Sequence, residues 1–255
     1  MKLHYKKTGD TGPILVILHG LFGSLDNWQT HAKKFGECFQ VYSVDQRNHG
    51  HSPHDMTFNY DVMVEDLFEL VTDLGLTNFH LLGHSMGGKT AIGFAAEHEE
   101  FLASLIIVDI CHKQYPRHHD DILKGLNALD LNQIKSRTEA DKELTKWIPE
   151  SAVRLFLLKN LYWIEKGKLD WRMNLHVLTR DIDKVIEEIY FRTIETKTLF
   201  IRGMESNYIK DSDYAQIELK FPNSTVKAIE NAGHWVHAEV PDIFSQTISG
   251  FVNGE

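Results

Sequence analysis

Residue types that together perform nucleophilic catalysis are spread along this chain, and the clearest of them is Ser85. It is the central residue of GHSMGG (83–88), a G-x-S-x-G pattern that follows the apolar run 79–82 and precedes apolar residues at helical spacing. A serine at such a strand-to-helix turn exposes its hydroxyl at the edge of the sheet. Gly83 and Gly87 are expected there because a Cβ at either position would collide across so tight a turn.

A base for this serine is expected late in the chain. A serine hydroxyl is a weak nucleophile until a neighbouring base removes its proton, and in folds with this turn the histidine follows the nucleophile and the acid in sequence. His234 lies in the glycine-containing segment 231–235, directly after the last predicted strand. The chain has 15 histidines, so it is position rather than residue type that selects His234.

The acid that orients the histidine has more than one candidate. Its usual place, after the penultimate strand, holds Ser206, and a serine cannot carry the required charge. Asp109 is favoured because it ends the strand that follows the nucleophile strand, within reach of His234. Glu205 is the alternative acid, and capping of the next turn is the alternative role for Asp109. Ser206 is expected to serve as an auxiliary residue through a hydrogen bond to the histidine–aspartate pair.

An oxyanion hole requires two backbone N–H groups near the nucleophile. The amide of Met86, which follows Ser85, is one candidate, and the amide of Leu21, in the glycine-rich loop after residues 14–18, is the other. His19 and His84 flank these positions and are expected to fix the loops by hydrogen bonds.

The elements around these residues alternate between strand and helix. Such alternation predicts an α/β fold, with a mostly parallel sheet covered by helices on both faces, and ligands of such sheets bind at the carboxyl ends of the strands. The predicted strands are 2–7, 14–18, 40–44, 79–82, 104–108, 198–201 and 225–229, and the predicted helices are 25–34, 63–74, the segment after Ser85, 208–220 and 240–252.

The alternation stops between about Cys111 and Thr196, a segment that is predicted to be helical throughout. The chain is therefore divided into a first core part (1–111), a helical cap (112–196) and a second core part (197–255), within one structural domain. The insertion follows a strand that ends at the catalytic edge, so the cap is expected to lie over that edge. Apolar residues of the cap and of the edge suggest an acyl pocket lined by Phe22, Trp147, Phe156 and Leu157. The alternative for the aromatic residues of the insertion, such as Trp147, is that they pack its own core.

Composition restricts the class of protein. The chain has 255 residues and a formal net charge of −9, with no basic cluster of the kind that binds nucleic acid. No run of ~18 apolar residues indicates a membrane span, and the first residues lack the apolar centre of a signal peptide. Cys38 and Cys111 are expected to be reduced thiols of a cytoplasmic protein. Neither metal-ligand spacing nor a phosphate or dinucleotide motif is present, so no metal and no cofactor are expected.

Five motifs resemble the YbfF-type esterases of the α/β-hydrolase superfamily: HGLFGSLDNW (19–28), VDQRNHGHSPH (44–54), GHSMGGKTA (83–91), VDI (108–110) and AGHWVHAE (232–239). The resemblance implies an α/β-hydrolase core of about eight strands, a cap, and hydrolysis of short acyl esters or acyl-CoA thioesters. By position, Ser85 resembles the nucleophile, His234 the base and Asp109 the acid after the sixth strand. Ser206 is similar to the serine that this family places where other hydrolases have an aspartate.

Two alternatives use the same scaffold differently. Relatives of similar appearance cleave C–C bonds or catalyse an elimination in menaquinone biosynthesis. In such an enzyme, Arg47 and the cluster 117–119 (Arg-His-His) could bind a polyanionic substrate. The simpler expectation for Arg47 and His49 is that they organise their own loop. A small-molecule sensor that turns over slowly is the other alternative, because fold alone does not define function. In each case the partner is a small molecule, and nothing in the sequence specifies an oligomeric state.

Overall fold

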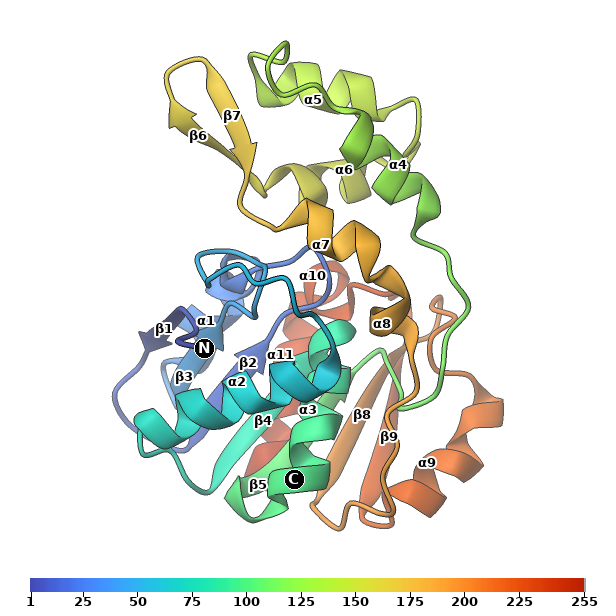
Figure 1. Ribbon diagram of the computed structural model, residues 1–255. Helices are drawn as coiled ribbons and strands as arrows, with labels where there is room; N and C mark the ends of the chain where they lie inside the picture. Colours follow the sequence, from blue (N-terminus) through green and yellow to red (C-terminus); the bar gives the residue numbers. More distant parts are fainter. Residues whose placement is uncertain (255) are drawn as a thin grey trace.

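The computed structural model describes residues 1–254 and contains a seven-stranded sheet with helices on both faces (Figure 1). The strand order is β1-β3-β2-β4-β5-β8-β9. The strands are β1 (Tyr5–Thr8), β2 (Ile14–Leu18), β3 (Gln40–Val44), β4 (Phe79–His84), β5 (Leu102–Val108), β8 (Thr198–Gly203) and β9 (Ser224–Ile229).

All neighbouring strands of this sheet are parallel except β1, which pairs antiparallel with β3. The α/β-hydrolase core predicted from the sequence is therefore confirmed, but the sheet has seven strands rather than about eight. A turn with two glycines in the left-handed region, Gly9 (φ 79°) and Gly12 (φ 86°), separates β1 from β2.

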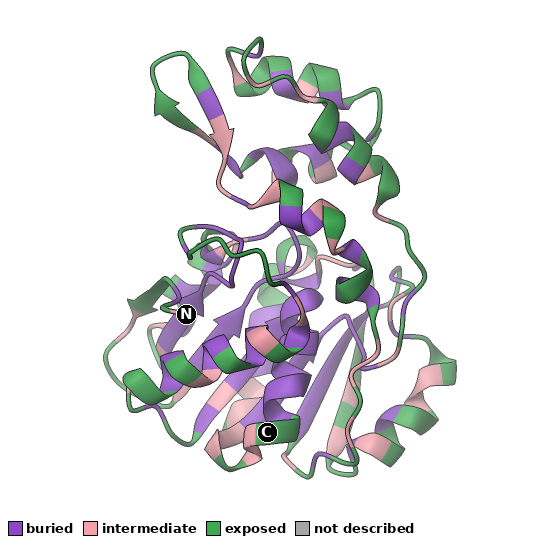
Figure 2. Ribbon diagram, viewed as in Figure 1, coloured by how far each residue is buried: buried purple, intermediate pink, exposed green. Residues whose placement is uncertain are grey.

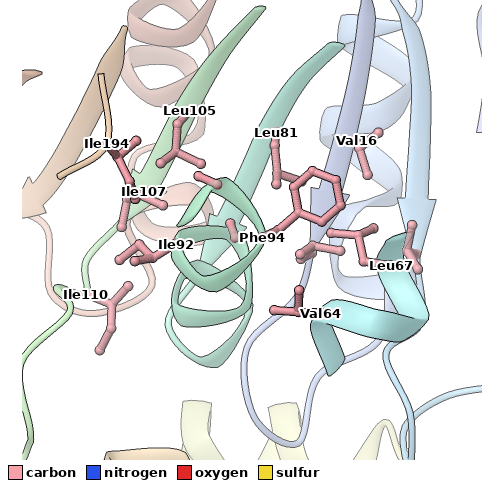
Figure 3. Packing of buried hydrophobic residues seen from close by; sticks show 14 of the residues in the cluster. Val16, Val64, Leu67, Leu81, Ile92, Phe94, Leu105, Ile107, Ile110 and Ile194 are labelled. Carbon is pink, nitrogen blue, oxygen red and sulfur yellow. The ribbon is translucent and has the colours of Figure 1, made fainter. Parts of the chain in front are cut away.

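Helices cover both faces of the sheet. The face packed by α2 and α3 holds a cluster that joins Leu67 and Phe94 from the helices to Val16, Leu81 and Leu105 from the strands (Figure 3). On the opposite face, α1 and α11 pack against the alternate strand residues. The helices of the core are η1 (Leu25–Trp28), α1 (Gln29–Phe35), α2 (Tyr60–Asp73), α3 (Met86–His98), η2 (Glu99–Phe101), η3 (Asp211–Asp213), α9 (Tyr214–Lys220), α10 (Val236–Glu239) and α11 (Pro241–Asn253).

The inserted segment between β5 and β8 stands over one end of the sheet, as Figure 1 shows in green to orange. The central strands β2, β3, β4, β5 and β8 are mostly buried, whereas the edge strands β1 and β9 and much of the insertion are exposed (Figure 2). Its elements are α4 (Asp120–Ala128), α5 (Arg137–Leu144), α6 (Ser151–Leu158), β6 (Leu161–Glu165), β7 (Lys168–Trp171), α7 (Leu175–Arg180) and α8 (Ile182–Ile186).

The prediction that this segment is helical throughout is wrong for residues 161–171, where β6 and β7 form an antiparallel hairpin. The hairpin pairs Leu161 with Trp171 and Trp163 with Leu169 across a turn at Gly167, whose φ is 85°. Aromatic and apolar residues on either side of a glycine turn are a hairpin signal, because paired strands use such side chains in cross-strand contacts.

None of the helices in residues 1–254 has the length and apolar character that a membrane crossing requires.

Candidate active site

Ser85 lies at the junction of β4 and α3, in a backbone conformation that few residues adopt (φ 52°, ψ −119°). Close backbone approaches force this turn. A Cβ on Gly83 would stand 2.2 Å from the carbonyl oxygen of Gly87, and a Cβ on Gly87 would stand 2.6 Å from that of Leu18. Neither position could hold a larger residue without moving the backbone, so the two glycines allow the tight turn that presents Ser85.

His234 and Asp109 are joined by a short hydrogen bond. The imidazole Nδ1 donates to Asp109 Oδ2 at 2.8 Å, and the other carboxylate oxygen accepts from the backbone N–H of Gly203 at 3.1 Å. Asp109 is completely buried. Because Nδ1 faces a carboxylate, it carries the proton, and Nε2 is the ring nitrogen left to accept one from a nucleophile.

The two other residues considered for the acid position lie differently. The Ser206 hydroxyl donates a short hydrogen bond to Asp109 Oδ2, and Ser206 is buried. Glu205 has an exposed side chain, while its backbone N–H donates to Ala232 O at 2.9 Å. The structure therefore brings Asp109 to His234 and Ser206 to Asp109, and it leaves the Glu205 side chain exposed.

The two candidate oxyanion amides belong to α3 and to the loop after β2. Met86 is the first residue of α3, so its N–H has no intrahelical acceptor and lies at the positive end of the helix dipole. Leu21 belongs to the loop after β2, in which the amide of Phe22 donates to His49 Nε2 at 3.2 Å. That loop lies close to the nucleophile, since a Cβ on Gly20 would approach Ser85 Cβ to 3.2 Å.

Buried neutral histidines fix the loops around the site. His19 Nδ1 donates to Gly20 O at 2.8 Å while its Nε2 accepts from the amide of Gln46 at 3.0 Å. His84 Nε2 donates to His234 O at 2.9 Å. Burial lowers the pKa of His19 to about 4, and it lowers the pKa of His84 well below its usual value. Both rings are neutral at physiological pH and hold the backbone segments that carry the catalytic candidates.

Ser85 and His234 line one cavity of about 230 Å³ between the core and the cap. Of the four predicted pocket residues, Phe22, Phe156 and Leu157 line it. The expectation for Trp147 is wrong: it is 40% exposed and does not line the cavity. A Cβ on Gly125 would approach the Trp147 side chain to 2.9 Å, so the indole packs on α4 within the cap rather than on the site.

Two cavity residues, Tyr208 and Trp235, had no role in the prediction. Tyr208, in the loop after β8, has its ring 4.0 Å from that of His234, and Trp235, whose ring lies 5.8 Å from that of Phe156, lines the same cavity. His118 and His119, which were considered only as part of a polyanion-binding cluster, also line it. No sequence pattern marks Tyr208, because its contact with the site depends on how the loop after β8 folds back over the sheet edge.

The two arginines that could have bound a polyanion are used elsewhere. Arg47 is buried and donates to both carboxylate oxygens of Asp66, at 2.5 and 2.9 Å, and to Thr57 O at 2.8 Å. Arg117 pairs with Asp120 and Asp183 on the surface of the cap. In the part of the chain that the structure describes, the cavity lining contains no Lys or Arg side chain. Across residues 1–254, no group of three or more His, Cys, Asp or Glu side chains is placed to hold a metal ion.

Comparison with known proteins identifies the family of this chain. Residues 13–144 match the family model for the alpha/beta hydrolase fold. The sn-1-specific diacylglycerol lipase ABHD11 of Mus musculus is 36% identical over 95% of this chain and 81% of its own length. Esterase YbfF of Escherichia coli is 32% identical over 94% of this chain and 92% of its own.

A solved structure described as a marine microorganism esterase superposes with a TM-score of 0.95. It is 38% identical and covers 98% of this chain and 99% of its own. The family model and the sequence relatives show the family, and this structural match shows the same fold. This chain belongs to the α/β-hydrolase fold family.

Proposed function

We propose that this protein is a serine esterase that cleaves small acyl esters through an acyl-enzyme intermediate. The relatives that share about a third of its residues are named esterases and lipases, and the chain is a serine hydrolase of esters. The observation that carries the mechanism is the buried Asp109 carboxylate on His234 Nδ1 at 2.8 Å, in a cavity that Ser85 also lines.

Each residue has a distinct part in the proposed cycle. His234 Nε2 takes the proton of Ser85, whose oxygen attacks the acyl carbonyl, and the amides of Leu21 and Met86 bind the resulting oxyanion. His234 then protonates the leaving alcohol, and water repeats the sequence on the acyl-enzyme. Asp109 stays ionised, holds the productive tautomer and stabilises the imidazolium. The cycle is complete without a cofactor.

The cavity favours neutral substrates of modest size. Its volume of about 230 Å³ is smaller than the roughly 300–1,000 Å³ typical of drug-sized pockets. The cap side chains Phe156 and Leu157 close it with apolar surface, so we assign residues 112–196 to substrate selection. The same acyl-enzyme chemistry extends to thioesters. An acyl-CoA, however, would have to place its phosphates outside a cavity whose described lining offers no basic side chain.

An activity-based probe tests the proposal directly. A fluorophosphonate should add once to the folded wild-type protein, with the adduct on the peptide that contains Ser85, and Ser85→Ala should remain unlabelled. Absence of an adduct on folded wild-type protein, or persistent labelling of the variant, would overturn the assignment.

Turnover then separates an esterase from a sensor. p-Nitrophenyl butyrate, a diacylglycerol dispersion and butyryl-CoA are compared at equal concentration, and steady-state release of butyrate from the aryl ester is expected to be fastest. A single burst of one acyl group per protein, without further turnover, would indicate a binding protein that uses the same serine.

A further inference from the structure

The ring of Tyr208 lies almost flat against the imidazole of His234. Their centroids are 4.0 Å apart and their planes differ by 17°. Tyr208 belongs to the loop after β8 and lines the same cavity as Ser85. Near-parallel aromatic rings in close contact limit the positions that each ring can take. The contact therefore restricts His234 from one side, in addition to the hydrogen bond that His234 donates to Asp109.

Three hydrogen bonds hold Tyr208 in this position. The hydroxyl of Tyr208 and His118 Nε2 are 2.6 Å apart. Because His118 Nδ1 lies 2.8 Å from Pro116 O, an acceptor only, Nδ1 carries the proton and Nε2 accepts from the phenol. The carbonyl of Tyr208 accepts from the Tyr115 hydroxyl at 3.0 Å, and its amide donates to Ser206 Oγ at 3.3 Å. Hydrogen bonds thus fix Tyr208 at its phenol, through His118 in the segment that enters the cap, and at its backbone, through Tyr115 and Ser206.

The charge that develops next to Tyr208 is positive. Apart from Asp109 and Tyr208, the titratable groups that face His234 are His84 from β4, His119 at the start of α4 and His237 from α10. Burial lowers the pKa of His84 well below its usual value, and it lowers the pKa of His119 and of His237 to about 3.

Burial also raises the pKa of Tyr208, so its phenol stays neutral. With no Lys or Arg among the described residues that line the cavity, the imidazolium of His234 becomes the cation that the electron-rich face of Tyr208 meets.

We propose that Tyr208 is a positioning residue of the hydrolytic reaction, whose ring, fixed by His118, holds the imidazole of His234 and stabilises its protonated form. The inference rests on the proposed esterase function, in which His234 is protonated after Ser85 attacks. Interactions between a cation and an aromatic face of this kind are worth about 0.5–2 kcal/mol, or roughly 3- to 30-fold in the population of the protonated ring.

Two variants separate the ring from its hydroxyl. Tyr208→Leu removes the aromatic face, and Tyr208→Phe keeps the face while removing the bond to His118. Tyr190→Leu is the matched control, because Tyr190 is 83% exposed and does not line the cavity. Circular dichroism and thermal melting establish that all three variants fold.

The first measurement is independent of turnover. Carbon-13 labelling of histidine lets NMR follow the His234 imidazole as pH changes, and the signal is assigned by its loss in His234→Gln. Tyr208→Leu should lower the midpoint of this titration by about 0.4–1.5 pH units, whereas Tyr208→Phe and Tyr190→Leu should leave it within about 0.2 units of wild type. An unchanged midpoint in folded Tyr208→Leu would overturn the inference, whatever the activity.

The second measurement is the pH profile for hydrolysis of p-nitrophenyl butyrate. Tyr208→Leu should lower kcat by roughly 3- to 30-fold with little change in KM, and its acidic limb should move to lower pH, a shift that a merely structural loss would not produce. Tyr208→Phe should retain kcat within about threefold. If Tyr208→Leu shifts the NMR midpoint but leaves kcat unchanged, the inference about Tyr208 is contradicted and the proposed esterase function is not. If the wild-type protein fails to react with a fluorophosphonate, the proposed function is contradicted as well.

Discussion

Asp109→Asn replaces one carboxylate oxygen by an amino group at the atom that contacts His234. In the structure, Asp109 Oδ2 accepts from His234 Nδ1 at 2.8 Å and also from the Ser206 hydroxyl, while Oδ1 accepts from the Gly203 amide at 3.1 Å. An asparagine that keeps its carbonyl toward Gly203 turns its amino group toward the imidazole. Two N–H donors would then face each other, so the ring must move its proton from Nδ1 to Nε2.

The loss expected from this change is large, because the wrong tautomer cannot accept the proton of Ser85. We expect kcat to fall by on the order of 10³–10⁴, which corresponds to about 4–5.5 kcal/mol in the activation free energy. Asp109 is completely buried and does not line the cavity, so substrate binding should change little. KM is therefore expected to stay within about threefold of wild type.

Initial rates with p-nitrophenyl butyrate at pH 7.5 give kcat and KM, and thermal melting shows whether each variant is folded. Glu205→Gln is the matched control, since the Glu205 side chain is exposed beside the same loop. It should keep kcat within about twofold, as is usual for a surface substitution. If the large loss appears in Glu205→Gln, or if folded Asp109→Asn retains more than a tenth of the activity, the assignment of the acid is wrong.

Three further changes probe the surroundings of the site. Ser206→Ala removes one neutral donor to Asp109 and should lower kcat tenfold or less, for a hydrogen bond worth about 1 kcal/mol; complete loss in the same aryl ester assay would instead make the hydroxyl essential. Leu157 lines the cavity, so Leu157→Phe should reduce the ratio of kcat/KM for octanoate esters over acetate esters by roughly tenfold or more. Trp147→Ala should leave that ratio unchanged. If the two variants change the ratio equally, the pocket assignment is refuted. Lys89 is buried, and burial lowers its pKa from 10.5 to about 7. Between pH 7 and pH 10.5 the unfolded chain therefore binds more protons than the folded protein, and the free energy of unfolding rises with pH. Urea unfolding at pH 7 and pH 9.5 should show wild type gaining stability relative to Lys89→Met as pH rises, and a stability difference between the two proteins that is independent of pH would contradict this.

Local geometry explains why the sequence alone could predict the turn at Ser85. The turn at Ser85 needs two glycines at fixed spacing between an apolar run and a helix, because backbone atoms pass within contact distance there. The position of His234 could be predicted from chain order, because in folds with this turn the histidine comes last. The last strand, β9, ends at the same edge of the parallel sheet as β4, the strand that precedes Ser85. These features depend on neighbours within a few residues, or on strand order, and both are visible in a sequence.

The helical cap was predicted less well, because its packing decides its conformation. Residues 161–171 form a hairpin although the surrounding segments are helical, and short apolar stretches do not distinguish a strand from a buried helix by periodicity. Trp147 was assigned to the pocket from its apolar character and its position in the predicted cap. The structure packs it against Gly125 instead, a contact within the cap that apolar character does not distinguish from a place in the pocket.

The sequence by itself determined the fold class, the position of Ser85 and the order in which the catalytic candidates follow one another. Tertiary structure decided which acid meets the imidazole, because Asp109 and His234 are 125 residues apart and Glu205 lies nearer in the chain but faces solvent. It also decided that Tyr208 stacks on His234. Such contacts depend on how separate strand ends and loops pack together in three dimensions, and no residue pattern along the chain records that packing.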